Sequence, residues 1–474
     1  MSFTAKTKNT NAFTKKSNAL SNIIRAAIKV TVGVTAAFAL VVSAQAATGK
    51  PEKENLKFGF IKLTDMAPLA VALENGYFED EGLNVELEAQ ANWKVVLDRV
   101  LTGQLDGSHM LMGQPVGAAA GFGTSGELVY AYALTQNDYA CTVGNDIWNM
   151  IKKSVPKGAD GKPIHPISAE VLKPVIQNFK NQGKPFNMGM VFPVSTHNMG
   201  LRYWLAAGGI NPGFYAPQKG DTSGQIGSDA LLSVVPPPQM PATLEAGTIN
   251  GYCVGEPWNQ QAVFRGIGVP VITVHNQIAD KIFGVTKVWA EKNPNTHIHV
   301  VKALIRAGKW LDDKDNANRQ AAAKIISNPN YVGADYKVIA NSMTGIFEYE
   351  RGDVRKEPDF NVFFRYNASY PFFSDAVWYL TQMRRWGQIP EAKPDNWYFD
   401  LAKKIAKPEV YQQAAKDLIE EGKMTAADFQ DFSKTDGYRS PDATEWMDGI
   451  KFDGHKPNDY LKLFSIGLKG DEKI

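Results

Sequence analysis

Residues 57–111 read KFGFIKLTDMAPLAVALENGYFEDEGLNVELEAQANWKVVLDRVLTGQLDGSHML, a segment in which apolar runs alternate with helix-starting residues and glycines. Three short runs in it are typical of strands: Lys57–Ile61, Val85–Leu87 and Leu105–Met110. Between them, Pro68 and Asn92 mark the starts of two helices, the second of which covers residues 93–101. This order predicts a βαβαβ unit, in which helices cover a parallel sheet.

The pattern starts again further along the chain. Its second set of predicted strands comprises Met188–Phe192, Leu231–Val235 and Tyr252–Val254. After about residue 299 the pattern is mostly helical, at 300–311, 319–326, 374–387 and 408–421. The stretch Lys152–Pro185 is rich in Lys, Pro and Gly, and we expect it to be a surface excursion. Two α/β units in series indicate an α/β protein with two lobes, each with its own sheet.

The charge is unevenly distributed along the 474 residues. The whole chain has 51 Lys and Arg against 49 Asp and Glu, but residues 1–46 contain six of the basic residues and no acidic one. An apolar run, Val30–Val42, and the segment Ala44-Gln45-Ala46 follow the basic residues, which is typical of a cleaved signal peptide covering residues 1–46. The alternative, a membrane anchor, needs about 20 apolar residues. We therefore expect an exported protein in the periplasm, and its near-neutral charge argues against nucleic acid as a partner.

Cysteines and histidines leave two questions open. Cys141 and Cys253 either pair in an oxidising compartment or remain separate, and the sequence does not decide between these states. His297 and His299 form a weak metal motif without a third ligand nearby, so we expect no metal. The usual motifs of nucleophilic, zinc and phosphate-binding sites are missing from the sequence, which argues against an enzyme.

Candidate binding residues lie where strands end and helices begin, because ligands of open α/β sheets bind there. They are Trp93, the pair Thr196 and His197, and Glu256. Each has a plainer interpretation: Trp93 as a packed edge residue, Thr196 as an N-cap, His197 as a loop residue, and Glu256 as a carboxylate at a helix start. For His197 we favour a neutral hydrogen-bond donor, because a cation is unfavourable at a helix N-terminus.

Several longer motifs resemble the nitrate/bicarbonate-type periplasmic binding proteins of ABC uptake systems. The most specific are LRYWLAAGGINP at 201–212 and CVGEPWN at 253–259, with supporting segments at 59–65, 75–87, 103–111, 378–388 and 452–467. The resemblance implies a type II, Venus-flytrap fold with additional C-terminal helices. It also implies one lobe from residues 47–140 and 271–474, the other from 141–270, and delivery of the ligand to an ABC permease and ATPase complex.

The same resemblance implies the ligand contacts. Trp93 and His197 would touch the anion, with Thr196 and Glu256 beside it, and Gln136 is the candidate for a glutamine expected near residues 134–143. Nitrate or nitrite is the preferred ligand, and no cofactor is expected. Bicarbonate is the alternative, with Ca²⁺ as a bridge to Glu256 if that carboxylate lines the cleft. A ligand sensor and an enzyme on the same fold remain rival functions.

Overall fold

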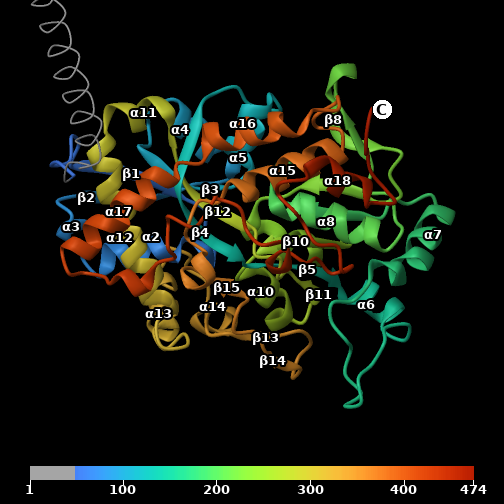
Figure 1. Ribbon diagram of the computed structural model, residues 1–474. Coiled ribbons are helices and arrows are strands. Elements are labelled where there is room, and N and C mark those ends of the chain that lie inside the picture. Colours follow the sequence, from blue (N-terminus) through green and yellow to red (C-terminus); the bar gives the residue numbers. More distant parts are fainter. Residues whose placement is uncertain (1–47) are drawn as a thin grey trace, which may run out of the picture. The chain divides into compact units, whose positions relative to one another are not determined.

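The βαβαβ unit forms one half of a six-stranded sheet in the computed structural model, which describes residues 48–474 (Figure 1). Its strand order is β15-β4-β12-β3-β1-β2. The parallel strands are β1 (Asn55–Phe60), β2 (Asn84–Ala89) and β3 (Gly107–Leu111). Antiparallel pairing then adds β12 (Ala279–Thr286), β4 (Leu128–Asn137) and β15 (Asn361–Val362). The predicted leader, residues 1–46, lies outside the described residues.

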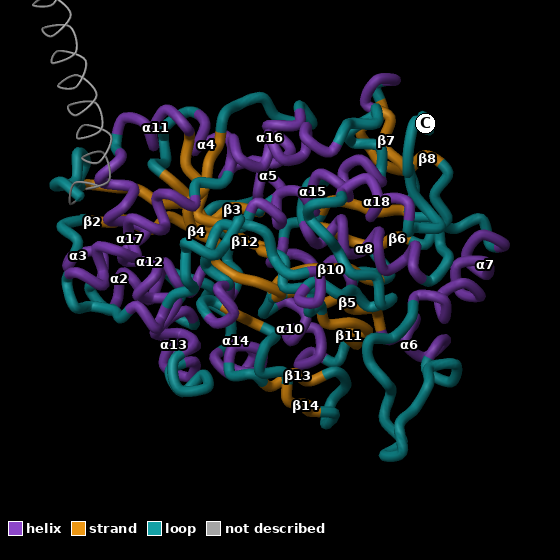
Figure 2. The backbone as a smooth tube through the Cα atoms, viewed as in Figure 1, coloured by secondary structure: helices purple, strands orange, loops and turns teal. Residues whose placement is uncertain are grey.

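A five-stranded sheet forms the second lobe, in the order β11-β5-β10-β6-β9. Its strands are β5 (Tyr139–Gly144), β6 (Asn187–Met190), β9 (Leu231–Val234), β10 (Gly251–Gly255) and β11 (Gly268–Thr273). The chain passes from the first sheet to the second at residue 138 and returns between residues 273 and 279. The two lobes expected from the repeated α/β pattern are therefore present, and both sheets lie inside a layer of helices (Figure 2).

Helices cover the faces of both sheets. Those of the first half are α2 (Ala67–Glu74), α3 (Tyr77–Asp80), α4 (Trp93–Leu101), α5 (Gly113–Ala120), α6 (Asn145–Ile151), α7 (Lys173–Asn181), α8 (Thr196–Ala207), α9 (Met240–Glu245) and α10 (Trp258–Arg265). Those of the second half are α11 (Lys287–Lys292), α12 (Pro294–Asp312), α13 (Arg319–Ile326), α14 (Tyr336–Met343), α15 (Phe373–Arg385), α16 (Asp395–Ile405), α17 (Pro408–Glu420) and α18 (Pro457–Lys462). Among the helices of residues 48–474, none combines the length and the apolar character that crossing a membrane requires.

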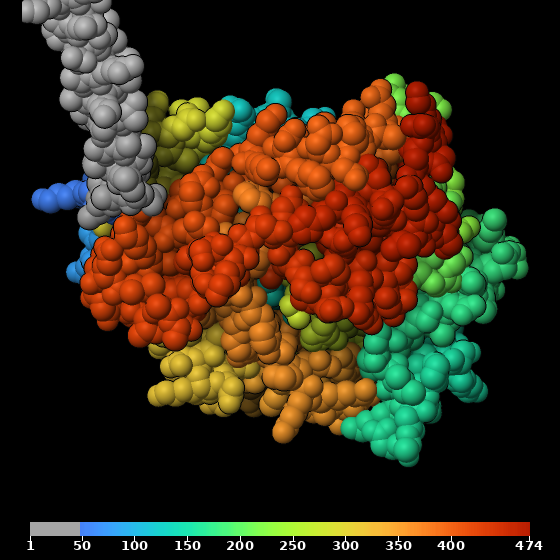
Figure 3. All heavy atoms as spheres, in the orientation of Figure 1, coloured from blue at the N-terminus to red at the C-terminus, as the bar shows by residue number. Residues whose placement is uncertain are grey.

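Two short hairpins complete the fold, β7 (Phe214–Ala216) with β8 (Asp221–Ile226) and β13 (Ile346–Glu348) with β14 (Val354–Lys356). The C-terminal segments, drawn orange to red, spread over one face of the molecule (Figure 3). One of these segments, α15, contacts α5 of the first lobe and α8 of the second. The C-terminal helices thus contact both lobes.

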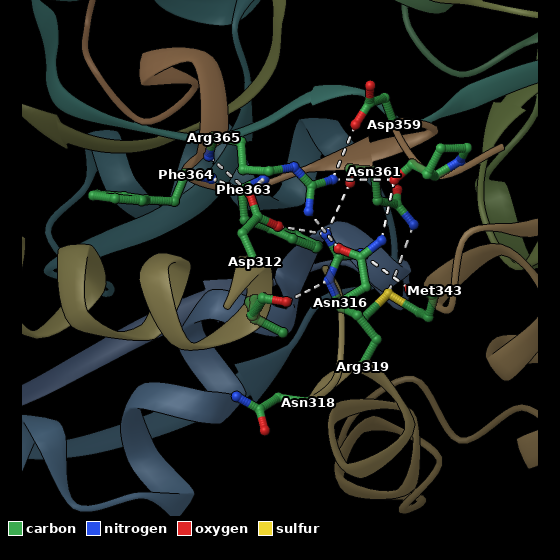
Figure 4. A network of polar contacts seen from close by, with 12 residues as sticks. Asp312, Asn316, Asn318, Arg319, Met343, Asp359, Asn361, Phe363, Phe364 and Arg365 are labelled. Atoms are coloured by element: carbon green, nitrogen blue, oxygen red, sulfur yellow. Dashed lines mark hydrogen bonds and ion pairs between the residues drawn. The ribbon is translucent and has the colours of Figure 1, made fainter. Parts of the chain in front are cut away.

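A buried ion pair fastens the edge strand β15 to the first lobe (Figure 4). Asp312, at the end of α12, pairs with Arg319 at the start of α13. The second carboxylate oxygen of Asp312 accepts the backbone N–H groups of residues 363, 364 and 365, at 2.7–3.0 Å. Arg319 in turn donates to the carbonyl of Asn361 at 2.9 Å. These bonds satisfy the polar groups of an otherwise irregular segment.

The structure corrects two local expectations and adds one short helix, α3, after residue 76, where Phe78 is buried. The excursion 152–185 is only partly a surface loop, since Ile167 and Leu172 are buried and α7 follows them. The N-cap of α8 is Ser195, whose hydroxyl accepts the N–H of Asn198 at 3.0 Å, so Thr196 is the first helical residue and its side chain is available for other contacts.

A disulfide joins the central strands of the second lobe. Cys141 on β5 and Cys253 on β10 stand opposite each other in the antiparallel register, with their Cα atoms 4.1 Å apart. Both cysteines are fully buried. The question that the sequence left open is therefore answered by the strand pairing, which brings together residues 112 positions apart.

Candidate ligand-binding site

The candidate site lies where strand ends of the two lobes meet. Thr64, just after β1, donates its backbone N–H to the carbonyl of Glu256, just after β10, at 2.8 Å. Nearby, the indole N–H of Trp258 on α10 donates to the carbonyl of Lys62 at 2.9 Å. These two bonds connect the lobes directly. The junction is therefore closed in this structure.

A buried lysine occupies the centre of the junction. Lys281 on β12 is fully buried, and its ammonium group lies 2.7 Å from Asp65 and also contacts Asp280. Burial alone would lower the pKa of Lys281, but the carboxylates of Asp280 and Asp65 outweigh it and raise that pKa. Lys281 is therefore a cation inside the protein.

Asp65 is the permanent counter-ion of this lysine. Besides Lys281, it lies 2.8 Å from the imidazole of His109 on β3. Burial would raise the pKa of Asp65, but Lys281 and His109 hold it well below its usual range. A cation and an anion are thus fixed side by side at the carboxyl ends of the first sheet.

Unpaired hydrogen-bond donors from both lobes surround this centre. Trp93 is the first residue of α4, and the ammonium of Lys281 lies 5.7 Å from the centre of its ring. The indole N–H of Trp93 has no hydrogen-bond partner among residues 48–474. In the second lobe, both ring nitrogens of His197 are buried without a hydrogen bond. The ring of Tyr139 packs on the ring of His197, with 5.0 Å between the ring centres. The hydroxyl of Tyr139 is also unpaired. Buried polar groups are rarely left unsatisfied, so these atoms indicate the place of a ligand.

His197 is neutral at this position. Burial and the nearby Lys281 ammonium hold the pKa of His197 well below its ordinary value. A neutral imidazole carries one N–H donor and one acceptor nitrogen. With its indole and ammonium neighbours, it can therefore donate a hydrogen bond to an anion without adding charge.

The other three predicted residues have different surroundings. The hydroxyl of Thr196 donates to Asp280, within the same cluster. One carboxylate oxygen of Glu256 accepts the N–H of Gln260, on the following helix α10, at 3.1 Å. Burial raises the pKa of Glu256 to about 8. The side-chain amide of Gln136 faces Arg439, and with the amide turned so that its oxygen points to the guanidinium, that oxygen accepts from two nitrogens at 2.5 and 2.6 Å. Trp93, Thr196 and His197 are thus brought together, and ligand contact by Glu256 and Gln136 stays a prediction.

Sequence reasoning did not single out the charged centre. Lys281 and Asp280 interrupt the apolar stretch of β12, and this pair of charges within a buried strand was the available signal. Asp138, between β4 and β5, is fully buried as well, and burial together with Asp65 raises its pKa well above the ordinary value. Asp65 and Asp138 each follow a buried strand, a position in which a buried carboxylate indicates a site.

The metal motif of the sequence does not form a centre. His297 is buried against the ring of Trp289, whereas His299 contacts Glu81 at 3.0 Å. Within residues 48–474, no three His, Cys, Asp or Glu side chains are arranged to hold a metal ion. The arrangement at the junction offers a buried cation and neutral donors, which suits a small anion.

These features define the class of the protein as a two-lobed periplasmic binding protein. A family model described as NMT1-like matches residues 49–327, and the chain belongs to this family. The nitrate/nitrite binding protein NrtA of Nostoc sp. is 32% identical over 430 residues, which cover 88% of this chain and 87% of the relative. The crystal structure of the periplasmic nitrate-binding protein NrtA from Synechocystis matches with a TM-score of 0.72 and 28% identity, over 88% of this chain and all of the other.

One further relative is longer than this chain. The nitrate import ATP-binding protein NrtC of Synechocystis sp. is 33% identical over 424 residues, which are 88% of this chain but 56% of NrtC. The chain thus spans about half the length of this relative. The two NrtA relatives are named as binding proteins, which fits a protein that is not an enzyme.

Proposed function

We propose that this protein captures nitrate or nitrite at the junction of its lobes, outside the cytoplasm, and delivers the anion to an ABC permease and its ATPase. The observation that carries the proposal is the buried ammonium of Lys281, which lies beside the unpaired N–H groups of Trp93 and His197. Both ligands are small planar monoanions that accept hydrogen bonds and donate none. Trp93, Thr196, His197 and Lys281 are the proposed contacts.

The state of Glu256 favours nitrate or nitrite over bicarbonate. The positive charge of Lys281 would attract any of these monoanions without a bridging Ca²⁺ or other cofactor. The acceptor that bicarbonate would use is Glu256. One of its oxygens accepts the N–H of Gln260 on α10, the other is buried without a hydrogen bond, and a pKa of about 8 keeps the group protonated at neutral pH. A carboxylate at Glu256 therefore gives less reason to expect bicarbonate as the ligand.

Calorimetry tests the proposal. Purified protein should bind nitrate or nitrite in the presence of EDTA, with one site per chain, and should bind bicarbonate more weakly with or without Ca²⁺. Sulfate is the control, because a dianion brings more negative charge than nitrate to a lysine that already has Asp65 as a counter-ion. Failure of nitrate and nitrite to bind would refute the proposed function, and bicarbonate binding that requires Ca²⁺ would replace it with the alternative.

Two further experiments address the rival functions and the location. A ligand recovered unchanged after incubation supports a receptor, whereas turnover would indicate an enzyme. Cell fractionation should place the protein in the periplasm without residues 1–46. An uncleaved chain in the cytosol would favour the sensor.

A further inference from the structure

Asp280 faces every polar group of the second lobe that we assign to the anion. One oxygen of its carboxylate accepts the hydroxyl of Thr196, and the other accepts the ammonium of Lys281. The latter oxygen also lies 3.8 Å from the Nε2 atom of His197. The side chain of Asp280 is fully buried.

A carboxylate has the same key properties as the proposed ligand. It is planar, it carries one negative charge spread over its oxygens, and it accepts hydrogen bonds in that plane. Asp280 therefore accepts hydrogen bonds from Thr196 and Lys281, two of the four proposed contacts, as a bound nitrate or nitrite would. Lys281 already has Asp65 as a counter-ion at 2.7 Å, so a third negative charge beside it would be repelled.

We propose that Asp280 is the internal competitor of the anion, and that nitrate or nitrite binds only when Asp280 takes up a proton from solvent. This inference rests on the proposed function. It makes Asp280 the residue that sets affinity, because the ionised form occupies the hydroxyl of Thr196 and the ammonium of Lys281, and the protonated form releases the ammonium to the anion. The charge of the closed site then stays the same when the anion enters.

The surroundings explain why Asp280 takes up a proton when the anion binds and Asp65 stays ionised. The titratable and charged groups that face Asp280 are Lys281 on β12, Asp65 after β1, Asp138 between the lobes, Tyr139 on β5, His197 on α8 and Tyr379 on α15. Burial raises the pKa of Asp280, Lys281 opposes this rise, and Asp65 adds to it. Asp65 has His109 as a second partner, and its pKa lies below the usual range.

Proton uptake during binding is the direct test. Nitrate binding is measured by calorimetry between pH 6.5 and 9.5 in pairs of buffers that differ in ionisation enthalpy. The wild-type protein should take up close to one proton per anion at the upper end of this range. Its affinity should fall about tenfold per pH unit there, because the ionised form of Asp280 becomes the dominant competitor.

The variant Asp280→Asn removes the ionisable competitor and keeps its shape. It should bind nitrate without proton uptake, and its affinity at pH 9.5 should exceed that of the wild-type protein by at least tenfold. Asp106→Asn is the matched control, since Asp106 is a buried carboxylate with its own lysine partner, Lys53, before β3. This control should keep the proton uptake of the wild-type protein.

The outcomes separate this inference from the proposed function. Nitrate binding by the wild-type protein without proton uptake at any pH would overturn the inference and leave the proposed function intact, even if Asp280→Asn did not fold. Undiminished proton uptake in Asp280→Asn would also overturn it. Failure of both nitrate and nitrite to bind the wild-type protein would refute the proposed function instead.

Discussion

Trp93 illustrates how a single position becomes a binding residue. Asn92 caps α4 by accepting the N–H of Val95 at 3.0 Å, and this cap places Trp93 in the first turn of the helix. The ring packs against His109 at 5.2 Å, so the indole is held in place while its N–H remains unpaired. The position of Trp93 follows from the local sequence, its rigidity depends on His109 of β3, and its ligand role depends on Lys281 of β12.

Trp93→Phe should weaken nitrate binding by about 1–3 kcal/mol, because the aromatic packing is retained and one buried hydrogen bond to the anion is lost. Calorimetry at constant pH measures the change. Trp204→Phe is the control, since the indole N–H of Trp204 already donates to the carbonyl of Ile167 at 2.8 Å. The control should lower stability and leave affinity unchanged; an unchanged affinity for Trp93→Phe would remove Trp93 from the proposed contacts.

The sequence predicts some residues of the site and not others, for a physical reason. Trp93 and His197 stand at helix starts after buried strands, where the chain direction alone brings side chains toward the ligand. Lys281 and Asp280 lie within a strand, so their role depends on antiparallel pairing of β12 with β3 and β4. That pairing joins residues 143 to 176 positions apart, from Ala279 with Gln136 to Gly284 with Ser108, and local patterns do not encode it.

At the scale of elements, α8 depends on a glycine in its second turn. A Cβ atom on Gly200 would lie 2.1 Å from the hydroxyl of Tyr139, which packs on His197. Alanine usually favours a helix over glycine by about 1 kcal/mol. Here the reverse should hold, because the added carbon would displace a buried ring.

Gly200→Ala should therefore lower the free energy of unfolding by about 1–3 kcal/mol and weaken nitrate binding, since the ring of His197 moves with Tyr139. Urea denaturation and calorimetry measure the two effects. The double variant Gly200→Ala/Tyr139→Phe should recover part of the stability, because the nearest clashing atom is removed. A stabilised single variant would contradict this account of α8.

A second element, the C-terminal end of α3, is held in place by ion pairs. Glu81 is buried, and it lies 3.0 Å from His299, 2.6 Å from Lys302 and 2.7 Å from Lys423. Burial opposes ionisation, but these three partners from α12 and the segment after α17 lower the pKa of Glu81 to about 2. The carboxylate thus connects three parts of the first lobe.

Because the folded-state pKa is lowered, the contribution of Glu81 is complete above its ordinary pKa of 4.5 and is lost as the pH falls toward 2. Glu81→Gln should lower the free energy of unfolding by about 2–4 kcal/mol at pH 7, and the difference from the wild-type protein should shrink by pH 3. Urea denaturation at both pH values measures it. Glu86→Gln, at an exposed position of β2, should change little at either pH. A difference for Glu81→Gln that does not depend on pH would contradict the ionic role.

For the whole molecule, the sequence indicates two lobes because the α/β pattern occurs twice. The proposed boundaries at 140/141 and 270/271 stay a prediction. The sequence does not indicate how the C-terminal helices contact both lobes, because helical periodicity identifies an apolar face and not its partner. In the structure, two hydrogen bonds join the segment after α15 to the second lobe. The carbonyl of Trp386 accepts the N–H of Tyr215 at 2.9 Å, and the side chain of Gln388 donates to the carbonyl of Pro193 at 2.8 Å.

The buried site implies that the lobes must separate for a ligand to enter. Trp93 and His197 are 1% and 0% exposed, so an anion from solvent cannot reach them in the closed form. The indole N–H of Trp258 and the carbonyl of Lys62 form one of the bonds that close the junction. A hydrogen bond of this kind contributes about 0.5–1.5 kcal/mol, which is enough to shift the balance between open and closed forms.

Trp258→Phe should therefore raise the dissociation constant of nitrate about 2–10-fold, because the closed form loses one bond between the lobes and the contacts of the anion stay unchanged. Calorimetry gives the affinity. Small-angle scattering should show that saturating nitrate makes both the wild-type protein and Trp258→Phe more compact. Trp289→Phe is the matched control, since its indole N–H donates at 2.9 Å to Asp106 within the first lobe. Equal affinity losses in the two variants would mean that the Trp258 bond acts through general stability, whereas a loss confined to Trp258→Phe assigns it to closure.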